Sequence, residues 1–368
     1  MKILKLYLIL FASTLFTLNT ALACTDIRVQ AKDGTVVIAR SMEFALDLQS
    51  NLRTSTRGRV FDNKTPDGKP ALGWKAKYGY VFLDGMQVDA VIDGMNEMGL
   101  SIEDLFMPGF AEYQTVPAGQ DTQALGYMRF GDWVLGNFKT IEEVRAALPS
   151  IFVYAEKIPG QGDTVFPLHF AIYDASGKGL IVEFVGGKLT MYDSMGVFTN
   201  SPSYEWHKLN LNNYINLSPV TPAPVVAQGV LYGATGQGFG MIGLPGDVSP
   251  PSRFIKMATL LHVAVPASDA TGALNLAQHV INNVDIPFGL VREPQANTYV
   301  SESTEWVVFK DLTNKIFYYR TYNNMGLNAI TLSKLNFADG APRLKMAIAN
   351  KESATDLTSQ FLQNKLVK

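Results

Sequence analysis

The stretch CTDIRVQAKDGTVVIARSMEF, residues 24–44, carries the strongest fold signal in the chain. Two runs of alternating apolar and polar residues flank Asp33-Gly34, a dipeptide that favours the tight turn of a β-hairpin. The stretch begins with Cys24, the only cysteine among 368 residues. A chain that starts a predicted strand with its single thiol needs a reason for that placement.

The residues before Cys24 have the pattern of a secretory signal peptide. Lys2 and Lys5 form a short basic region, and LYLILFASTLF (6–16) is an apolar core too short to span a bilayer. Ala-Leu-Ala at 21–23 matches the small-residue A-x-A cleavage site. These features predict removal of the leader at this site.

Cleavage after Ala23 would divide the chain into a signal peptide over 1–23 and a mature chain over 24–368, exported to the periplasm or secreted further. Cys24 would then carry a free α-amine beside its thiol. A second interpretation stays open here, in which Cys24 is the lipid attachment point of an envelope protein. Lipoprotein signals usually have a leucine-like residue three positions before the cysteine, where this chain has Ala21. The first interpretation is therefore favoured.

Composition narrows the classes of partner and the expected number of domains. The formal net charge of −2 gives no reason to expect nucleic acid as a partner. Hydrophobic residues make up 47% and charged residues 17%, and a mature chain of this length buries a large core, so we predict a single domain over 24–368. No later stretch approaches 18 uninterrupted apolar residues, which argues against stable membrane insertion. One cysteine cannot form an internal disulfide.

Strand patterns and helix patterns fall in separate groups along the chain. Alternating apolar runs broken by glycine turns continue over 78–106 and 168–194, and a late hairpin is expected over 304–324. Helices are expected over 123–138, 141–148, 252–265 and 272–284, the second of them opened by a capping box of Thr140 and Glu143. Because strands come in hairpin groups and helices in separate groups, we predict an α+β fold with antiparallel sheets and not an alternating βαβ fold.

The first hairpin brings two charged side chains near the thiol. If Asp33-Gly34 is a two-residue turn, Cys24 pairs with Glu43, and Arg40 lies close to the same end of the ladder. Arg40 and Glu43 would then point to opposite faces of a regular strand. For both to reach the thiol, we expect a bulge near Ser41-Met42.

An N-terminal cysteine supplies its own general base. An α-amine has a pKa of about 7.7–8 and a thiol a pKa of about 8.5, so the neutral amine can take the thiol proton. Arg40 would favour the thiolate, and Glu43 would hold or orient the amine. This chemistry requires no histidine. The four histidines, His169, His207, His262 and His279, do not have the spacing of metal ligands. We expect neither a metal nor an organic cofactor.

A second acidic feature lies in SIEDLF, residues 101–106, where Glu103 and Asp104 are adjacent. Adjacent residues on a strand face opposite sides of the sheet. We therefore expect no catalytic carboxylate pair here.

Four segments in a fixed order carry a family resemblance. They are the opening hairpin, DGMNEMGL (93–100), FTNSPSYEWHKLNLNNY (198–214) and GQGFGMIGLPGDVSPPSRFIKMA (236–258). Together they resemble the choloylglycine hydrolase family, which includes penicillin V acylases and bile salt hydrolases, from Cys24 to about residue 335. The resemblance implies the N-terminal nucleophile hydrolase fold, with four αββα layers around two packed antiparallel sheets. It also implies hydrolysis of linear amide bonds through an acyl-enzyme, without metal or cofactor.

The resemblance assigns roles to single residues. It makes Cys24 the nucleophile with its α-amine as the base, and Arg40 the arginine that supports the thiolate. Asn200, in TNSP, matches the asparagine whose amide donates to the oxyanion. Arg253, in PPSRF, matches a second active-site arginine. Bile salt hydrolases commonly have aspartate where this chain has Glu43, which keeps the charge and adds a methylene.

Phe106 directs the choice of substrate. Many bile salt hydrolases have asparagine at this position, whereas penicillin V acylases tend to have an aromatic residue. In both groups the backbone N–H of this residue is thought to complete the oxyanion hole. An aromatic ring suits an apolar or aryl acyl group, so the expected substrates are penicillin V, N-acyl homoserine lactones and conjugated bile salts, in that order.

Two rival interpretations remain open from the sequence. One is an inactive relative that binds acyl amides, and the other is the lipid-anchored, non-catalytic envelope protein. The family often forms homo-oligomers, commonly tetramers, with a contribution from the segment after Asn200. The proline-rich, loop-like residues 218–229 are the expected counterpart in this chain.

Overall fold

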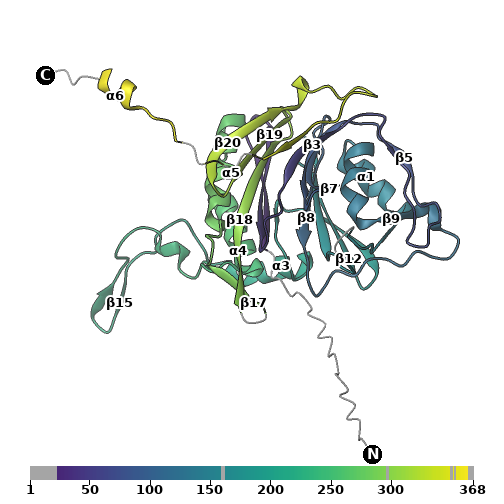
Figure 1. Ribbon diagram of the computed structural model, residues 1–368. Coiled ribbons are helices and arrows are strands. Elements are labelled where there is room, and N and C mark those ends of the chain that lie inside the picture. Colours follow the sequence, from purple (N-terminus) through teal and green to yellow (C-terminus); the bar gives the residue numbers. More distant parts are fainter. Residues whose placement is uncertain (1–22, 159–161, 296–297, 349–350, 352–353, 364–368) are drawn as a thin grey trace, which may run out of the picture.

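The structure is a computed structural model that describes residues 23–158, 162–295, 298–348, 351 and 354–363. Two antiparallel sheets pack face to face, and helices cover the outer face of each, which gives four layers (Figure 1). This arrangement confirms the α+β fold with two packed antiparallel sheets. The predicted signal peptide lies outside the described residues, apart from Ala23.

The first sheet has seven strands. Their order is β14 (Val197–Phe198), β1 (Cys24–Gln30), β2 (Val36–Phe44), β18 (Thr298–Asp311), β19 (Ile316–Thr321) and β20 (Asn324–Thr331), with β17 (Val291–Gln295) paired to β18.

The second sheet has eight strands. Their order is β13 (Lys188–Asp193), β12 (Gly179–Val185), β11 (Leu168–Tyr173), β8 (Ser101–Phe106), β7 (Val88–Asn96), β6 (Tyr80–Gly85), β3 (Asn51–Ser55) and β21 (Lys345–Ala347).

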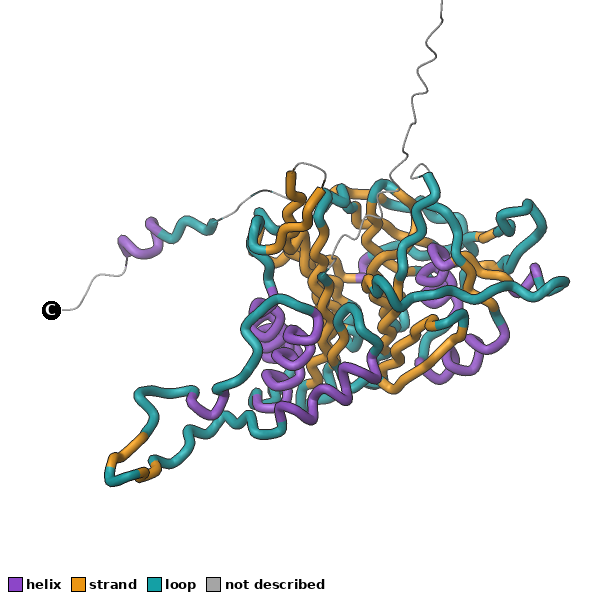
Figure 2. Tube along the Cα trace, turned by 90° about the horizontal axis from the view of Figure 1, so that it is seen from below, coloured by secondary structure: helices purple, strands orange, loops and turns teal. Residues whose placement is uncertain are grey.

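Helices cover the two outer faces, as Figure 2 shows from a second direction. On the first sheet lie α4 (Pro250–Val263) and α5 (Ala270–Ile281), and on the second lie α1 (Phe130–Asn137) and α2 (Ile141–Ala147). The remaining α-helices are α3 (Tyr204–Asn210) and α6 (Thr358–Gln363). Short 3₁₀ turns cover Asp121–Gln123, Tyr127–Arg129, Leu148–Ser150, Leu211–Tyr214, Phe239–Met241, Asn282–Val284 and Leu332–Lys334.

Three small strand pairs complete the described elements. They are β4 (Val60–Phe61) with β5 (Trp74–Lys75), β9 (Ala124–Gly126) with β10 (Phe152–Tyr154), and β15 (Val225–Ala227) with β16 (Val230–Tyr232). The last pair forms a hairpin that projects from the body of the molecule (Figure 1). Among the described residues, no helix combines the length and apolar character needed to cross a bilayer.

Two expected elements need correction, and one is confirmed. The helix expected over 123–138 is confined to α1, because the residues before it form β9, which pairs with β10, and a 3₁₀ turn. The expected loop 218–229 contains β15, since Val225–Ala227 pairs with β16. The capping box of α2 is confirmed, because the Glu143 N–H donates to Thr140 Oγ1 at 3.3 Å.

The opening hairpin has a longer loop than expected. The Ala31 N–H donates to the Thr35 carbonyl at 2.8 Å, so the loop contains three residues instead of two. Gly34 has φ +91°, the left-handed conformation that closes this kind of loop at little cost for glycine. The register is therefore one residue away from the expected one, and Cys24 pairs with Met42.

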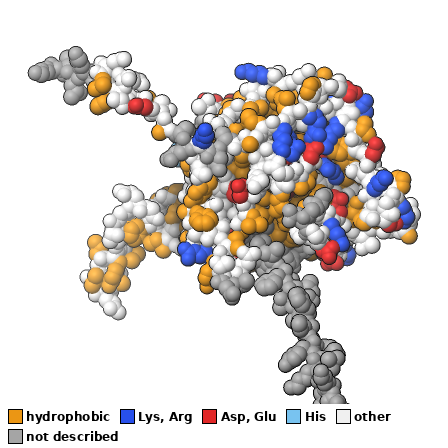
Figure 3. All heavy atoms as spheres, viewed as in Figure 1, with side chains coloured by type: hydrophobic (Ala, Val, Ile, Leu, Met, Phe, Trp, Pro, Cys, Tyr) orange, Lys and Arg blue, Asp and Glu red, His pale blue; other side chains and the backbone are white. Residues whose placement is uncertain are grey.

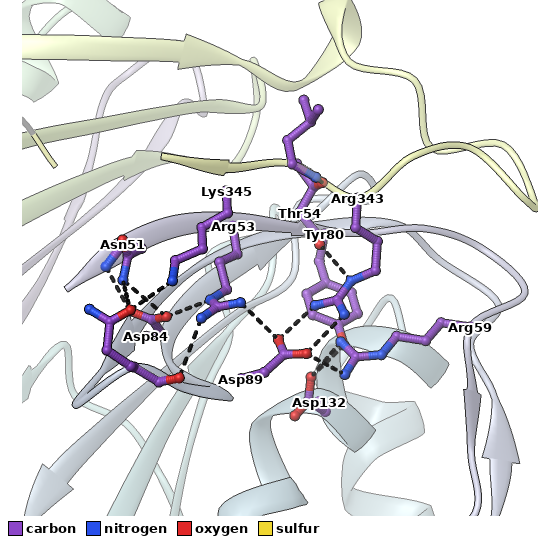
Figure 4. Close-up of polar contacts among 12 residues, drawn as sticks. Asn51, Arg53, Thr54, Arg59, Tyr80, Asp84, Asp89, Asp132, Arg343 and Lys345 are labelled. Carbon is purple, nitrogen blue, oxygen red and sulfur yellow. Dashed lines mark hydrogen bonds and ion pairs between the residues drawn. The ribbon is translucent and has the colours of Figure 1, made fainter. Parts of the chain in front are cut away.

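The C-terminal strand is held by a cluster of part-buried charges (Figure 4). Arg343 forms two hydrogen bonds to the Asp89 carboxylate, at 2.8 and 2.6 Å, and its Nε donates to the Thr54 carbonyl at 3.1 Å. Arg59 reaches the same carboxylate at 3.1 Å. These contacts hold the chain beside β3, where β21 adds the edge strand.

Candidate active site

Cys24 opens β1, and the shifted register puts Arg40 on the same side of the sheet. Cys24 pairs with Met42 and Asp26 with Arg40, so these four side chains share one face. Arg40 Nη2 donates to Cys24 Sγ at 3.3 Å. The guanidinium also lies over the Trp306 ring, 4.8 Å from its centroid. The hairpin thus places a fully buried cation directly against the thiol.

Two neighbouring strands separate beside this pair. The pairing of β7 with β8 reaches Asp93 and Glu103 and stops there. Beyond that point the Asp104 carbonyl accepts from Arg40 Nη2 at 2.7 Å, and the Phe106 carbonyl accepts from Asn200 Nδ2 at 2.8 Å. Backbone groups that no longer serve the β7–β8 ladder therefore hold two of the predicted site residues.

The Phe106 N–H faces the same edge of the strand. The Met107 N–H donates to the Pro167 carbonyl, and Phe106 is opposite Leu168 in the next, non-hydrogen-bonded pair of the antiparallel ladder. In such a pair the N–H and the C=O both point away from the partner strand. The Phe106 N–H is thus directed to the side on which its own carbonyl meets Asn200.

Asn200 joins Cys24 to β8. Its Oδ1 accepts from Cys24 N at 2.6 Å, and an asparagine amide has two N–H donors, so one remains beyond the bond to Phe106. The Asn200 carbonyl lies 2.8 Å from His207 Nε2. Burial lowers the pKa of His207 to about 4, so the neutral ring donates this hydrogen bond and fixes the asparagine backbone.

Arg253 is buried and binds the first two residues of β1. It lies in the first turn of α4, and its Nη1 donates to the Cys24 carbonyl and, at 2.6 Å, to Thr25 Oγ1. Its Nη2 donates to Asn200 Oδ1 at 2.7 Å. The same asparagine oxygen therefore accepts from both Arg253 and Cys24 N.

Glu43 lies on the opposite face of β2 from the thiol. The β1–β2 register is regular, so the bulge expected near Ser41-Met42 is absent from this strand pair. The register shift lies instead in β18, between Thr304 and Trp306. Thr304 Oγ1 donates to the Glu43 carboxylate at 3.1 Å.

The Glu43 carboxyl has a second buried carboxyl near it. Burial raises the pKa of Glu43 to about 7, although the Arg253 charge opposes this. Burial, and then the charge of Glu43, raise the pKa of Glu302 to about 8. Both Glu302 oxygens lack a hydrogen-bond partner among the described residues. Two acidic groups that titrate close to neutral pH thus face one arginine.

The environment of the thiol combines opposing effects. Cys24 is 3% exposed, and this burial raises the pKa of its thiol. The Arg40 charge acts in the other direction and favours the thiolate. Arg40 therefore offsets part of the cost of ionising a buried thiol.

A small apolar cavity begins at the thiol. Its volume is about 60 Å³, and Cys24, Arg40 and Asp104 contribute its polar walls. The apolar walls are Met42, Phe44, Leu48, Ile92, Phe106, Phe166 and Leu168. The ring of Phe166 meets those of Phe44 and Phe106 edge to face, at centroid distances of 6.2 and 5.8 Å. A second cavity of about 60 Å³ shares Leu48, Ile92, Asp104, Phe166 and Leu168 with the first and extends it toward Tyr127 and Ile158.

The structure brings the other five predicted site residues together around Cys24, although Glu43 approaches from the other sheet face. Sequence reasoning missed Trp306 beneath Arg40 and His207 behind Asn200. His207 stands in the quoted motif around Asn200, so its position there was a usable signal. Trp306 comes from β18, and only the pairing of β18 with β2 reveals its contact.

Within the described part of the chain, no cluster of three or more His, Cys, Asp or Glu side chains is placed to hold a metal ion.

Comparison with known proteins gives a consistent picture. Residues 24–352 match the family model "Linear amide C-N hydrolases, choloylglycine hydrolase family". A bile salt hydrolase/transferase of Clostridium perfringens is 33% identical over 322 residues, which cover 85% of this chain and 93% of that protein. The crystal structure of a variant of conjugated bile acid hydrolase from Clostridium perfringens superposes with a TM-score of 0.81 at 30% identity, covering 91% of this chain and all of that one. A penicillin V acylase of Pectobacterium atrosepticum is 25% identical over 338 residues, which cover 86% of this chain and 82% of that protein.

Proposed function

Because this chain belongs to the choloylglycine hydrolase family of linear amide C–N hydrolases, we propose that it is an exported acylase of the penicillin V acylase type. Its substrates are small amines that carry an apolar or aryl acyl group. The observation that carries the proposal is the position of the Cys24 thiol, against the Arg40 guanidinium, at the end of a cavity walled by three phenylalanine rings.

The proposed reaction starts with the mature N-terminus. The α-amine of Cys24 takes the thiol proton, and the Arg40 charge supports the thiolate. The sulfur attacks the amide carbon, and the negative charge develops on the carbonyl oxygen. The second N–H of Asn200 and the backbone N–H of Phe106 donate to that oxygen, a contribution of roughly 3–4 kcal/mol per donor in other enzymes.

The intermediate then breaks down to products. The C–N bond breaks, the ammonium of Cys24 passes its proton to the leaving nitrogen, and the acyl group stays on the sulfur as a thioester. Water, deprotonated by the same amine, attacks the thioester and releases the carboxylic acid. Arg253 and Asn200 hold Cys24 in place throughout.

The choice of acyl group rests on the cavity. Its aromatic walls favour a ring, and penicillin V carries a phenoxyacetyl group, so this amide is the first substrate to test. N-acyl homoserine lactones come second, because Leu48, Ile92 and Leu168 also suit an alkyl chain. Conjugated bile salts are the third candidate, and they are favoured by the identity to the bile salt hydrolase of Clostridium perfringens.

The decisive test uses the mature enzyme and its Cys24→Ala variant with these three substrates. We expect turnover of the phenoxyacetyl amide by the wild type, and loss of turnover in the variant with an unchanged circular dichroism spectrum. Full activity of Cys24→Ala would exclude the mechanism. Binding without turnover by the wild type would instead support the inactive relative.

The intact mass of the exported protein tests the predicted leader. A mass that matches residues 24–368 with a free amine supports removal of the signal peptide and export to the periplasm or beyond. Added diacylglyceryl and acyl groups would support the lipid-anchored protein. The burial of Cys24 favours the first outcome, since a lipidated sulfur could not stay beside Arg40.

We also propose that the mature chain forms a homo-oligomer, with a tetramer as the expected size. Hydrophobic side chains cover the projecting β15–β16 hairpin (Figure 3), and Val226 and Leu231 are 70% and 67% exposed. Light scattering on a Val226→Thr, Leu231→Thr variant should show a smaller particle. Val265→Thr, at a site that is 81% exposed outside the hairpin, is the matched control and should leave the size unchanged.

A further inference from the structure

Asp104 is a buried acidic residue that the proposed mechanism does not use. It lies on β8 beside Glu103, and the two side chains face opposite sides of the sheet. Glu103 pairs with Lys310 between the sheets. Asp104 instead lines both cavities that lead away from the thiol, is 6% exposed, and has a buried Oδ1 without a hydrogen-bond partner among the described residues.

The neighbours of Asp104 along its own strand are apolar. On the same face of β8, the flanking positions are Ile102 and Phe106, which are both apolar. A buried polar group without a partner costs roughly 1–3 kcal/mol. A leucine or valine would fill this position without that cost, so the carboxyl group needs a compensating role.

Arg40 supplies only part of that compensation. The guanidinium donates to the backbone carbonyl of Asp104, at 2.7 Å, and its charge lowers the pKa of the carboxyl group. Burial dominates, however, and raises the pKa of Asp104 well above its usual range. A neutral carboxyl group has one O–H donor and remaining acceptor sites, so it can bond to a neutral oxygen atom.

Resting on the acylase function proposed above, we infer that Asp104 is a specificity residue that recognises an oxygen atom in the acyl group, two or three bonds beyond the scissile carbonyl carbon. Arg40 Nη2 touches both Cys24 Sγ, at 3.3 Å, and the Asp104 carbonyl, at 2.7 Å. That contact places the backbone of Asp104 beside the thiol, whereas its carboxyl group lies on the face of β8 that carries Ile102 and would meet the acyl group through the cavity that Asp104 and Cys24 both line. The cavity around it is otherwise apolar, which suits an acyl group with a hydrocarbon body and one oxygen near its start.

This chemistry describes an aryloxyacetyl group, whose ether oxygen is two bonds from the carbonyl carbon. A 3-oxoacyl or 3-hydroxyacyl chain presents its oxygen one bond farther. An acyl chain that is pure hydrocarbon near its carbonyl would leave the carboxyl group unpaired. The inference therefore ranks substrates by that oxygen, and the three phenylalanine rings favour the aryl ether.

The test compares two substrates that differ at one atom. The mature enzyme is assayed with the phenoxyacetyl and 3-phenylpropanoyl amides of the same chromogenic amine, in which the ether oxygen is replaced by a methylene group. We expect the wild type to prefer the ether by about tenfold in kcat/KM, the effect of one net hydrogen bond. Asp104→Ala should bring this ratio to about one, whereas Asp104→Asn, which keeps a donor, should retain most of it.

Leu168→Val is the matched control, because Leu168 lines the same two cavities without a polar group. It should change kcat/KM for both substrates in the same proportion. If Asp104→Ala keeps the wild-type ratio of kcat/KM for the two substrates, whether or not both values fall, the inference is overturned and Asp104 is a structural residue. Melting curves confirm that each variant is folded. If the wild type cleaves neither amide, the proposed aryl acylase function fails, a result that involves no Asp104 variant.

Discussion

The two faces of the eight-stranded sheet are both buried, but they are built from different residues. The face toward α1 and α2 packs aromatic and aliphatic side chains, with the ring of Phe130 4.5 Å from that of Phe170. The face toward the first sheet carries a fully buried ion triad, in which Lys310 contacts Asp93 at 2.6 Å and also Glu103. This second face adjoins the layer that holds Arg40 and the thiol.

The difference shows where the molecule gains stability and where it accepts a cost. Apolar contacts such as those of Phe130 stabilise the fold directly, by roughly 25 cal/mol per Å² of buried area. A buried ion triad is close to neutral in free energy at best, because desolvation offsets the attraction of the charges. Charged residues between the sheets are therefore better explained by the proposed role of Arg40 beside the Cys24 thiol than by folding, since Asp93 also raises the pKa of Arg40.

The sharpest test of this comparison removes the cation between the sheets. Lys310→Met leaves Asp93 and Glu103 buried without their partner, and we expect a loss of ~3–5 kcal/mol in the free energy of unfolding. Without Lys310 the folded-state pKa of both carboxyls rises further above the unfolded values. The free energy of unfolding of the variant should therefore fall as pH rises from the unfolded-state to the folded-state pKa of these carboxyls. The loss of stability relative to the wild type should be larger at pH 8 than at pH 5. Urea unfolding at the two pH values measures it.

A neutral triad provides the control for that measurement. The variant Lys310→Met, Asp93→Asn, Glu103→Gln has no buried charge at these positions, so it should recover part of the stability and lose the extra pH dependence. A single Lys310→Met variant that is equally stable at both pH values would contradict the role given to the ion triad.

The other face provides the contrasting prediction. Phe130 is fully buried among aromatic rings, and Phe130→Ala should cost ~3–5 kcal/mol through lost burial and the cavity left behind. No titratable group is removed, so the loss should be the same at pH 5 and pH 8. Urea unfolding checks this, together with kcat per folded molecule, which should stay within about twofold because Phe130 lines neither cavity at the thiol. A pH-dependent loss would show that the two faces are not independent.

The sequence patterns predicted the α+β class because their signals are local, whereas the four-layer arrangement was implied by the family resemblance. Alternating runs, glycine turns and the Thr140 cap each depend on a few neighbouring residues, and they led to the α+β class. The register of the first hairpin was missed because Asp33-Gly34 fits both a two-residue turn and the end of a three-residue loop. That one-residue difference decides which side chains share a face with Cys24.

The sequence predicted which residues form the candidate site, but not the hydrogen bonds and cavity contacts that connect them. Cys24, Arg40, Asn200 and Arg253 were identified from motifs, and the structure places them within one hydrogen-bonded group. The role of Asp104 could not be predicted, because its cavity exists only where β7 and β8 separate. Such contacts depend on strand pairing between distant segments, which leaves no local pattern in the chain.

Glu302 offers a milder test on the first sheet. Its folded-state pKa of about 8 is above the ordinary 4.5, so the wild type should lose stability as pH rises from about 4.5 to about 8. Glu302→Gln removes this titration, and we expect a gain of ~1 kcal/mol at pH 8.5 with little change at pH 4.5. Thermal melts across this range measure it. An unchanged pH slope in the variant would show that Glu302 is already paired or hydrated in solution.

The smallest expected effect lies at the edge of the eight-stranded sheet. Arg343 and Asp89 are about one-third exposed, so Arg343→Ala should cost only ~0.5–1 kcal/mol, less at high salt. The change should appear locally as faster hydrogen exchange in β21, because Arg343 also donates to the Thr54 carbonyl beside that strand. Arg57→Ala is the matched control, since the Arg57 side chain is more exposed than that of Arg343 and its ion pair with Glu97 does not hold an edge strand. Equal effects of the two variants would mean that these surface charges do not fix the C-terminal strand, and that the backbone pairing of β21 with β3 is sufficient.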